Sequence, residues 1–294
     1  MSNEHLQDVK QGKRFQFGSN WRSFLRTLDE DRVREAVESL RQMLGVDDLS
    51  GMRFLDIGSG SGLFSLAARR LGARVHSFDF DPESVACAME LRRRYFTDDP
   101  AWSVEEGSAL DEAYLASLGK FDVVYSWGVL HHTGDLAKGL SNAMRAVAEG
   151  GLLFIALYND QEELSRFWLA VKRTYCSGPV ARAVVLSSFV PWFALQSMAV
   201  GLVRHGRPLK RFVDYWKRRG MSPVHDWVDW LGGLPFEVAK PGDVVELHRR
   251  AGFELVRIKT TNRLGCNEFV FRRAAHSDAE RATPTARHDL EGAR

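Results

Sequence analysis

The sequence has few cysteines and no excess of charge of one sign. Three cysteines occur in 294 residues and none forms a CxxC pair, so we expect no disulfide framework and no bound metal of the zinc type. The 40 Lys and Arg residues against 38 Asp and Glu give a formal net charge of +2. So small a charge gives no global electrostatic reason to expect a nucleic-acid or acidic partner. The small number of cysteines favours a reducing compartment.

An apolar N-terminal stretch and internal repetition are also lacking. Residues 1–15 are polar, so the sequence predicts no secretory signal and we expect a cytoplasmic protein. No repeat of about 20 to 50 residues is present. Residues 274–294 are small, polar and charged, which predicts a disordered tail. The hydrophobic fraction of 45% and the charged fraction of 27% are those of an average soluble globular protein.

Short apolar runs alternate with helical patterns from Arg53 onward. Five runs precede residue 160 and two follow residue 240: RFLDIG, RVHSFDF, WSVEEG, FDVVYSWG, LLFIALY, FELVRIKTT and NEFVFRR. Strands separated by helices predict βαβ units, a parallel sheet and helices on both of its faces. The sequence therefore predicts an α/β fold with a Rossmann-like, doubly wound, mostly parallel sheet of seven strands.

Residues 161–240 interrupt this alternation. We expect them to lie over the carboxyl ends of the strands, where such sheets bind ligands, as a helical lid inserted between strands five and six. Before the sheet, Phe15, Phe17, Trp21 and Phe24 form an aromatic cluster, followed by an amphipathic helical pattern. The predicted order is a segment covering the site, a cofactor-binding core, a lid that binds the substrate, the end of the sheet and a tail, over residues 1–50, 51–160, 161–240, 241–273 and 274–294.

A glycine-rich turn follows the first predicted strand, in the sequence LDIGSGSG from Leu55 to Gly62. Glycine lets the backbone turn sharply and approach a ligand, and the N-terminus of the next helix offers free N–H donors. The spacing is GxGxG with Asp56 just before it, and it differs from the GxGxxG of dinucleotide-binding proteins. A carboxylate at that point suits a ligand that carries an amino group.

The second predicted strand ends in the sequence FDFDP, about 20 residues beyond the glycines. A carboxylate at this distance can accept hydrogen bonds from both hydroxyls of a ribose, and we assign that role to Asp79. Asp81 stands directly before Pro82 and is more simply interpreted as the N-cap of the following helix.

These residues, with EGSALD at 106–111 and FDVVYSWGVLHHTGD at 121–135, resemble the class I S-adenosylmethionine-dependent methyltransferase family. The resemblance covers about residues 50–160 and, more weakly, 240–273, where it implies a last antiparallel strand. It implies S-adenosyl-L-methionine as the cofactor and S-adenosyl-L-homocysteine as the product. The residues that it implies for cofactor binding are Asp56, Gly58, Gly60, Asp79, Phe80, Ser108, Ala109 and Trp127.

The resemblance also implies what several of these residues contact. Gly58 and Gly60 would cradle the methionine part, and Phe80 would pack on the adenine. Ser108 and Ala109 would line the edge of the adenine. Ser108 departs from the family pattern, because many members carry Asp there to accept the adenine amino group. That contact would then shift to a backbone carbonyl or to Asp111.

Methyl transfer from a sulfonium is an in-line displacement, so the enzyme has mainly to align donor and acceptor and exclude water. A base is needed only where the acceptor must lose a proton. His131 and His132 follow the fourth predicted strand and are candidates for that base, unless they pack or hydrogen-bond at a helix start. At the end of the fifth strand, Tyr158 is a catalytic candidate and Asn159 a substrate-binding one; the alternative is a turn capped by Asp160.

The insertion contains MSPVHDWVDWLGGLPFE at residues 221–237, where large aromatics alternate with His and acidic residues. We predict a substrate pocket from His225, Asp226 and Trp230 together with Trp21. The alternative is the core of a small cap whose acids are exposed. An aromatic and acidic pocket can equally bind a cation, which keeps S-methylation of a small thioether amino acid such as methionine open beside O- or N-methylation of a metabolite.

Residues 183–203 form a run of 21 residues without a charge, long enough for a membrane-spanning helix. Three serines, a glutamine and a proline in the run disfavour a span. Residues 204–219 follow with seven Lys and Arg against one Asp. The two stretches predict either lid helices, one of them buried or packed in a homo-oligomer interface, or a peripheral element at 183–219 that lies on an anionic membrane. No RNA-recognition module accompanies the basic residues, so nucleic acid is disfavoured.

The sequence therefore favours a methyltransferase that acts on a small-molecule acceptor. The rival from another class is a non-catalytic protein that keeps the fold and binds a membrane or a protein through its apolar and basic insertion. Gly58, Gly60 and Asp79 are all present, which favours catalysis because a degenerate scaffold would not need them.

Overall fold

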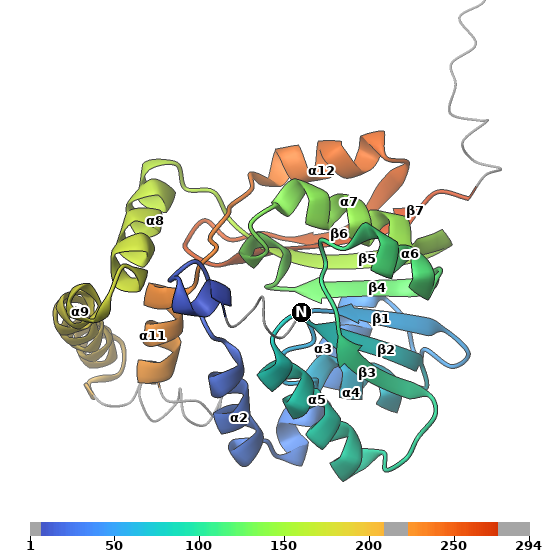
Figure 1. The fold of residues 1–294 in the computed structure, drawn as a ribbon, viewed down its shortest axis with the longest axis horizontal. Helices are drawn as coiled ribbons and strands as arrows, with labels where there is room; N and C mark the ends of the chain where they lie inside the picture. The colour runs from blue at the N-terminus through green and yellow to red at the C-terminus, as the bar shows by residue number, and fades with distance from the viewer. Residues whose placement is uncertain (1–6, 209–222, 276–294) are drawn as a thin grey trace, which may run out of the picture.

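The computed structural model describes residues 7–208 and 223–275. Its centre is a seven-stranded sheet in the order β3-β2-β1-β4-β5-β7-β6, with helices on both faces (Figure 1). Neighbouring strands from β1 to β5 pair in parallel, and β7 is antiparallel to β5 and β6. This architecture confirms the predicted fold class. The strands are β1 Arg53–Ile57, β2 Arg74–Asp79, β3 Trp102–Glu106, β4 Phe121–Trp127, β5 Val147–Tyr158, β6 Phe253–Lys259 and β7 Cys266–Arg273.

Helices precede, link and follow these strands. The predicted tail lies outside the described residues apart from its first two positions. The helices are α2 Gly18–Thr27, α3 Glu30–Leu44, α4 Leu63–Arg70, α5 Pro82–Tyr95, α6 Glu112–Leu118, the 3-10 helix η1 Leu130–His132, α7 Leu136–Ala146, α8 Glu163–Cys176, α9 Pro179–His205, α11 Pro223–Gly232 and α12 Pro241–Arg250.

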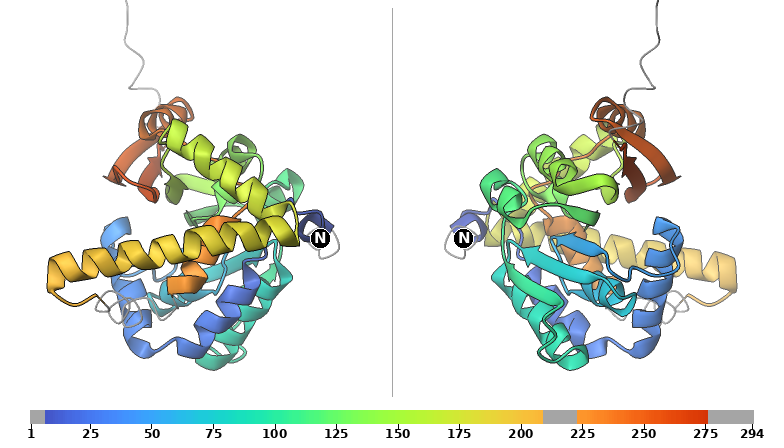
Figure 2. Two further views of the ribbon diagram at one scale, coloured as in Figure 1. Left: turned by 90° about the vertical axis from the view of Figure 1, so that its left-hand side faces the viewer. Right: turned by 90° about the vertical axis from the view of Figure 1, so that its right-hand side faces the viewer.

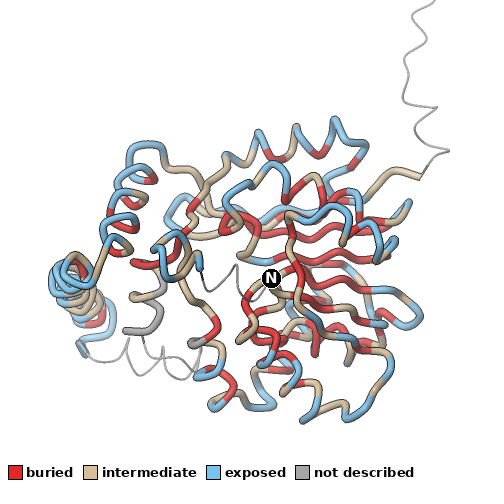
Figure 3. The backbone as a smooth tube through the Cα atoms, in the orientation of Figure 1, coloured by how far each residue is buried: buried red, intermediate tan, exposed pale blue. Residues whose placement is uncertain are grey.

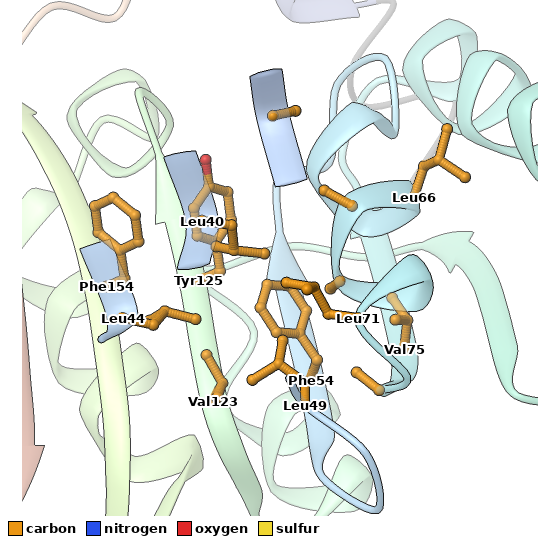
Figure 4. Close-up of a cluster of buried hydrophobic side chains, with 14 of the residues drawn as sticks. Leu40, Leu44, Leu49, Phe54, Leu66, Leu71, Val75, Val123, Tyr125 and Phe154 are labelled. Carbon is orange, nitrogen blue, oxygen red and sulfur yellow. The ribbon is translucent and has the colours of Figure 1, made fainter. Parts of the chain in front are cut away.

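The central strands are apolar on both faces because helices cover both sides of the sheet. In β5 every residue from 151 to 157 is buried. Successive side chains of a strand point to opposite faces, so Phe54 of β1 joins one apolar cluster and Leu55 the other. Figure 4 shows the first cluster, to which α3 contributes Leu40 and Leu44, α4 contributes Leu66 and β1 contributes Phe54.

Helix starts follow from short local signals. Asp81 accepts a hydrogen bond from the Glu83 backbone N–H at 2.9 Å and caps α5, as predicted. Asp111 caps α6 by accepting from the Tyr114 N–H at 3.0 Å. These caps fix where the helices begin after β2 and β3, and so fix the loops at the carboxyl edge of the sheet.

The helices α8, α9 and α11 stand between β5 and β6 in the chain, where the insertion is predicted, and pack around Trp168, Tyr175 and Leu231. The polar start of the chain reaches them, because the Phe15 N–H donates to the Leu234 carbonyl at 3.0 Å. Figure 2 shows α9 as a long rod that projects beyond the rest of the fold. The N-terminal segment and the insertion therefore meet beside the sheet.

A buried lid helix was one of the alternatives predicted for residues 183–203, and it is wrong. Val185 and Gly201 are the buried residues of α9, and the tube in Figure 3 is mostly pale or tan along this helix. The helix is apolar on the side that packs on α8 and also on the side that faces solvent. Because this helix is exposed, two of the predicted interpretations of residues 183–203 remain: an oligomer interface and a membrane-binding surface.

Candidate cofactor and acceptor site

The loop between β1 and α4 is built on glycines with positive φ. Gly58 has a φ of 75° and Gly60 a φ of 54°, which side-chain-bearing residues rarely adopt. A Cβ at Gly58 would lie 2.3 Å from Val129 Cγ1, so only glycine lets this loop approach the loop after β4 so closely. The Gly58 N–H donates to the Phe78 carbonyl at 2.9 Å, which ties the loop to the end of β2.

Asp79 stands at the carboxyl end of β2 and is held in place by backbone donors. Its Oδ2 accepts from the Gly60 N–H and its Oδ1 from the Asp81 N–H, both at 2.9 Å. Burial raises the pKa of Asp79 to about 6, although these two hydrogen bonds act in the opposite direction. The carboxyl group thus has a fixed orientation beside the glycine loop, and its remaining lone pairs can accept from a ligand.

Asp56 lies beneath the same loop and is 2% exposed. It accepts from the Ser65 hydroxyl, which also lies 2.7 Å from the Ser77 hydroxyl, and Ser77 accepts from Trp102 Nε1 at 2.9 Å. Burial raises the pKa of Asp56 to about 7. The prediction that Asp56 contacts the ligand directly is not supported by this geometry, because its carboxyl group takes part in a buried network that fixes the loop.

The predicted adenine side contains Phe80, Ser108 and Ala109. Phe80 is partly exposed, and the Arg14 guanidinium lies 4.9 Å from the centre of its ring. Ser108 Oγ accepts from the Leu110 N–H at 3.2 Å, and the Ala109 carbonyl accepts from Asn142 Nδ2 at 3.0 Å. The Ala109 carbonyl is therefore already bonded, as is the capping carboxylate of Asp111.

Trp127 ends β4 on the same edge of the sheet and is 43% exposed. The cofactor contact that the resemblance implies for Trp127 stays a prediction. Trp21 of α2 was predicted to bind the substrate, and this stays a prediction. A Cβ at Gly60 would lie 3.0 Å from Trp21 Cε2, so the indole packs on the cofactor loop.

The N-terminal segment crosses the loops that would bind the cofactor. The Gly18 N–H donates to Asp81 Oδ2 at 2.8 Å, and Arg14 Nη1 donates to the His132 carbonyl at 3.0 Å. The Phe17 ring lies 5.1 Å from the His132 ring. Arg14 was not among the predicted site residues, and its contacts join the cofactor side to the acceptor side.

The two histidines after β4 lie against Tyr158 at the end of β5. The rings of His131 and Tyr158 are 3.9 Å apart, and those of His132 and Tyr158 are 5.3 Å apart. His131 is fully buried and His132 is 9% exposed. The structure therefore brings together the three residues predicted to be catalytic.

Hydrogen bonds assign a neutral form to each histidine. Nδ1 of His132 faces the Pro235 carbonyl, so this nitrogen is the donor and Nε2 carries the lone pair. Nδ1 of His131 accepts from the Tyr158 N–H at 3.4 Å, which places the proton on Nε2. Among the described residues, His131 Nε2 has no hydrogen-bond partner although it is buried. It is a donor that a bound acceptor would satisfy.

Burial lowers the pKa of both histidines. The pKa of His131 falls well below its usual value, and that of His132 falls to about 3. The charge of Lys172 lowers both pKa values further. Both imidazoles are therefore weak bases, which disfavours the predicted role of a general base working near neutral pH.

Lys172 of α8 is a site residue that the sequence reasoning missed. It is fully buried, donates to the Trp230 carbonyl, and places Nζ 4.3 Å from the Trp230 ring and 4.8 Å from the Phe236 ring. Trp230 also packs on Tyr158, with ring centres 5.6 Å apart. One signal was present in the sequence: Lys172 follows Trp168 by four residues, on the apolar face of a helix.

Trp230 lies beside Tyr158, and its predicted substrate contact stays a prediction; the side chain of Asn159 is bonded within the protein. Asn159 Nδ2 donates to the Thr261 carbonyl at 3.1 Å, and its Oδ1 accepts from Asn267 Nδ2 at 3.0 Å. The prediction of a substrate contact by Asn159 is corrected, because its side chain ties β5 to β7. The side chains of His225 and Asp226 lie outside what the structure describes.

A pocket of about 380 Å³ opens next to this cluster. It lies between the end of β5, the first turns of α8 and the segment before α12. Phe236 lines the pocket and also packs on Tyr158, with ring centres 5.5 Å apart. The residues that line it are Asp160, Glu162, Ser165, Arg166, Leu169, Phe236, Val238 and Lys240.

Comparisons with known proteins agree with this arrangement. A family model described as a methyltransferase domain matches residues 28–183, more than half of the chain. Ubiquinone biosynthesis O-methyltransferases are similar to the chain: that of Methylobacterium sp. is 33% identical over 119 residues, 40% of this chain and 46% of the relative. That of Methylocella silvestris is 33% identical over 138 residues, 47% of this chain and 51% of the relative. The chain spans about half the length of these curated relatives.

Solved structures share the fold. Magnesium protoporphyrin IX methyltransferase from Synechocystis, crystallised with bound S-adenosylhomocysteine, has a TM-score of 0.51 at 15% identity, over 87% of this chain and 95% of its own. An O-methyltransferase family protein from Burkholderia thailandensis has the same TM-score at 14% identity, over 83% of this chain and 57% of its own. The chain belongs to the class I S-adenosylmethionine-dependent methyltransferases.

Proposed function

We propose that the protein transfers the methyl group of S-adenosylmethionine to an oxygen atom of a small-molecule acceptor and releases S-adenosylhomocysteine. The observation that carries the proposal is the position of Asp79 and the glycine loop at the same sheet edge as His131, His132 and Tyr158. The relatives, which match this chain over about half of their own length, are named O-methyltransferases, and this supports the choice of oxygen.

The residues at the sheet edge fit the cofactor. Gly58 and Gly60 give the loop its positive φ, and Val129 and Trp21 pack against the two glycines where a Cβ would otherwise stand. Asp79 has a carboxylate fixed by two backbone donors, with lone pairs left for two ribose hydroxyls. Phe80 offers a partly exposed ring for the adenine. When bound, the cofactor supplies an electrophilic methyl group, and these residues would orient it.

The names of the relatives support oxygen over sulfur as the methylated atom. Burial, and to a smaller extent the charge of Lys172, lowers the pKa of both neighbouring histidines, so each imidazole is neutral. A neutral imidazole can donate or accept a hydrogen bond with a hydroxyl group. We therefore rank S-methylation and N-methylation below O-methylation.

The proposed roles on the acceptor side follow from the tautomers. His131 would donate from Nε2 to the acceptor oxygen, and His132 would receive a hydroxyl hydrogen bond at Nε2. Tyr158, Trp230 and Phe236 would pack on an apolar part of the acceptor and exclude water. With both imidazoles too weakly basic to take the proton, the acceptor oxygen releases its proton to water, so an acidic acceptor such as a phenol or a carboxylic acid reacts best.

The test is release of S-adenosylhomocysteine by the purified chain with panels of phenols, carboxylic acids, amines and thioethers, and with no acceptor as the control. We expect turnover with an oxygen acceptor. Turnover only with a thioether would replace the proposal by S-methylation. Binding of the cofactor without turnover on any class would favour the non-catalytic rival, which keeps the fold as a binding module.

We propose a cytoplasmic protein that contacts a membrane only peripherally. The three cysteines are free among the described residues, which suits a reducing compartment. One helix of the described chain, α9, is long and apolar enough to cross a membrane by length and composition. Its packing on α8 and α11 favours a position along a surface over a span. A homo-oligomer is the other proposal for this helix, and sedimentation velocity would detect it.

A further inference from the structure

We infer that the solvent-facing side of α8 and α9 binds the surface of an anionic lipid bilayer. We define this α8–α9 surface by six exposed side chains: Phe167, Val184, Trp192, Leu195, Met198 and Leu202. The inference goes beyond the proposed methyl transfer and does not depend on it. It rests on how apolar side chains and charges are distributed along two helices of the described structure.

The exposed apolar residues of α9 lie on one side of the helix, with Ser187 and Ser188 between Val184 and Trp192. Val184, Trp192, Leu195, Met198 and Leu202 recur at intervals of three, four or eight residues, which places them on one side of a helix. Leu195 is 66% exposed and Leu202 is 56% exposed. Single exposed apolar residues are ordinary, but a stripe along a helix of about 40 Å is a surface that a soluble monomer rarely leaves uncovered.

The opposite side of α9 is already used for packing. Phe189 and Phe193 contact Trp168 of α8, with ring centres 5.6 Å and 6.2 Å away. Rotation of the helix therefore cannot bury the exposed stripe without opening this cluster. Phe167 of α8 lies beside Phe189, with ring centres 6.4 Å apart, and extends the apolar surface onto α8. The partner that covers the surface has to come from outside the described fold.

The charges around the α8–α9 surface favour an anionic partner. α9 itself, Pro179–His205, contains two arginines and neither Asp nor Glu. Arg182 is exposed near the start of α9, and Arg204 and Arg207 are exposed at and just beyond its end. An apolar stripe flanked by arginines matches an anionic bilayer, in which acyl chains take the apolar groups and lipid phosphates the guanidinium groups.

A second copy of the chain fits this surface less well. A twofold dimer buries the same patch from both subunits. It would therefore bring arginines of one subunit towards those of the other, with no acidic residue in α9 to pair with them. Lipid headgroups supply negative charge for the arginines at the two ends of α9.

The test is flotation of the full chain with vesicles of phosphatidylcholine alone and of phosphatidylcholine with about 30% phosphatidylglycerol. We expect flotation with the anionic vesicles, and loss of it at high salt because screening weakens the attraction. The double variant Trp192→Glu/Leu195→Glu should reduce the floated fraction at least about tenfold. The matched control is Ile258→Glu on β6, a residue 41% exposed and distant in the chain, and it should float like the parent.

Other outcomes overturn the inference. Absence of flotation, or equal loss in the double variant and the Ile258→Glu control, would contradict it. Resistance to carbonate extraction would mean that α9 spans the membrane. A lipid-free dimer that the double variant dissociates, with no vesicle binding, would assign the surface to a second copy. Quenching of Trp192 by brominated lipid, and its loss in Trp192→Phe, locates the contact on α9 itself.

Discussion

Asp79 is the residue on which cofactor binding most depends at the scale of single side chains. Its carboxylate anchors the Gly60 backbone, and we propose that it also accepts hydrogen bonds from the ribose. Replacement by Ala removes an acceptor for two hydroxyls, each worth about 1.5 to 3 kcal/mol when the acceptor is charged. Asp79→Ala should therefore weaken S-adenosylhomocysteine binding roughly a hundredfold or more, measured by calorimetry. Asp29→Ala, which removes the cap of α3, is the control and should bind normally.

Asp56 makes the stability of the fold depend on pH. Its pKa is about 7 in the folded chain, raised by burial from an ordinary value near 4. Because the folded state holds the proton more tightly, this group's contribution to stability is full below about pH 4 and is lost as the pH rises through about 7.

Asp56→Asn should remove that dependence while keeping an acceptor for Ser65. The unfolding free energy of the variant minus that of the parent should rise from pH 5 to pH 7.5 by an amount on the order of 2 to 3 kcal/mol. Urea unfolding at both pH values measures the difference. An equal difference between variant and parent at the two pH values would contradict the assigned pKa.

Lys172 is expected to act through its charge. Lys172→Met should raise the pKa of His132, because the charge that lowers it is gone. The same variant should reduce kcat about a hundredfold with the oxygen acceptor identified by the turnover assay, and it should leave cofactor affinity unchanged. NMR titration of His132 follows the first effect and steady-state kinetics the second. Arg173→Met, on the exposed side of the same helix, should change neither.

At the scale of elements, we propose that the N-terminal segment covers the cofactor loop. Trp21 of α2 packs on Gly60, and Arg14 joins Phe80 to the His132 carbonyl. Cofactor entering beneath this cover should change the surroundings of the Trp21 indole. We expect S-adenosylhomocysteine to alter tryptophan fluorescence in the parent and in Trp192→Phe, and much less in Trp21→Phe. An unchanged response in Trp21→Phe would contradict the cover.

At the scale of the whole molecule, sequence patterns predicted the features that depend on residues close together in the chain. The sheet, the glycine turn, Asp79 and the cap at Asp81 each follow from signals within a few positions. The role of Asn159 could not be predicted, because its partners Thr261 and Asn267 lie more than 100 residues away.

Trp21 and Lys172 illustrate the same limit. Whether an aromatic residue joins the cofactor side or the acceptor side depends on how α2 and the insertion dock on the sheet. The exposure of α9 was also unpredictable, since a run that is apolar on all sides suits a buried helix as well as a membrane surface. Local patterns define the cofactor edge, and long-range packing defines the acceptor side.

The most direct test of methyl transfer to oxygen uses S-adenosylmethionine with a deuterated methyl group. The full chain is incubated with an oxygen acceptor that releases S-adenosylhomocysteine, and the labelled product is located by mass spectrometry and NMR. We predict the deuterated methyl on an oxygen atom, with no labelled product in Asp79→Ala at the same cofactor concentration. Label on nitrogen or sulfur, or labelled product formed equally by Asp79→Ala, would contradict the account.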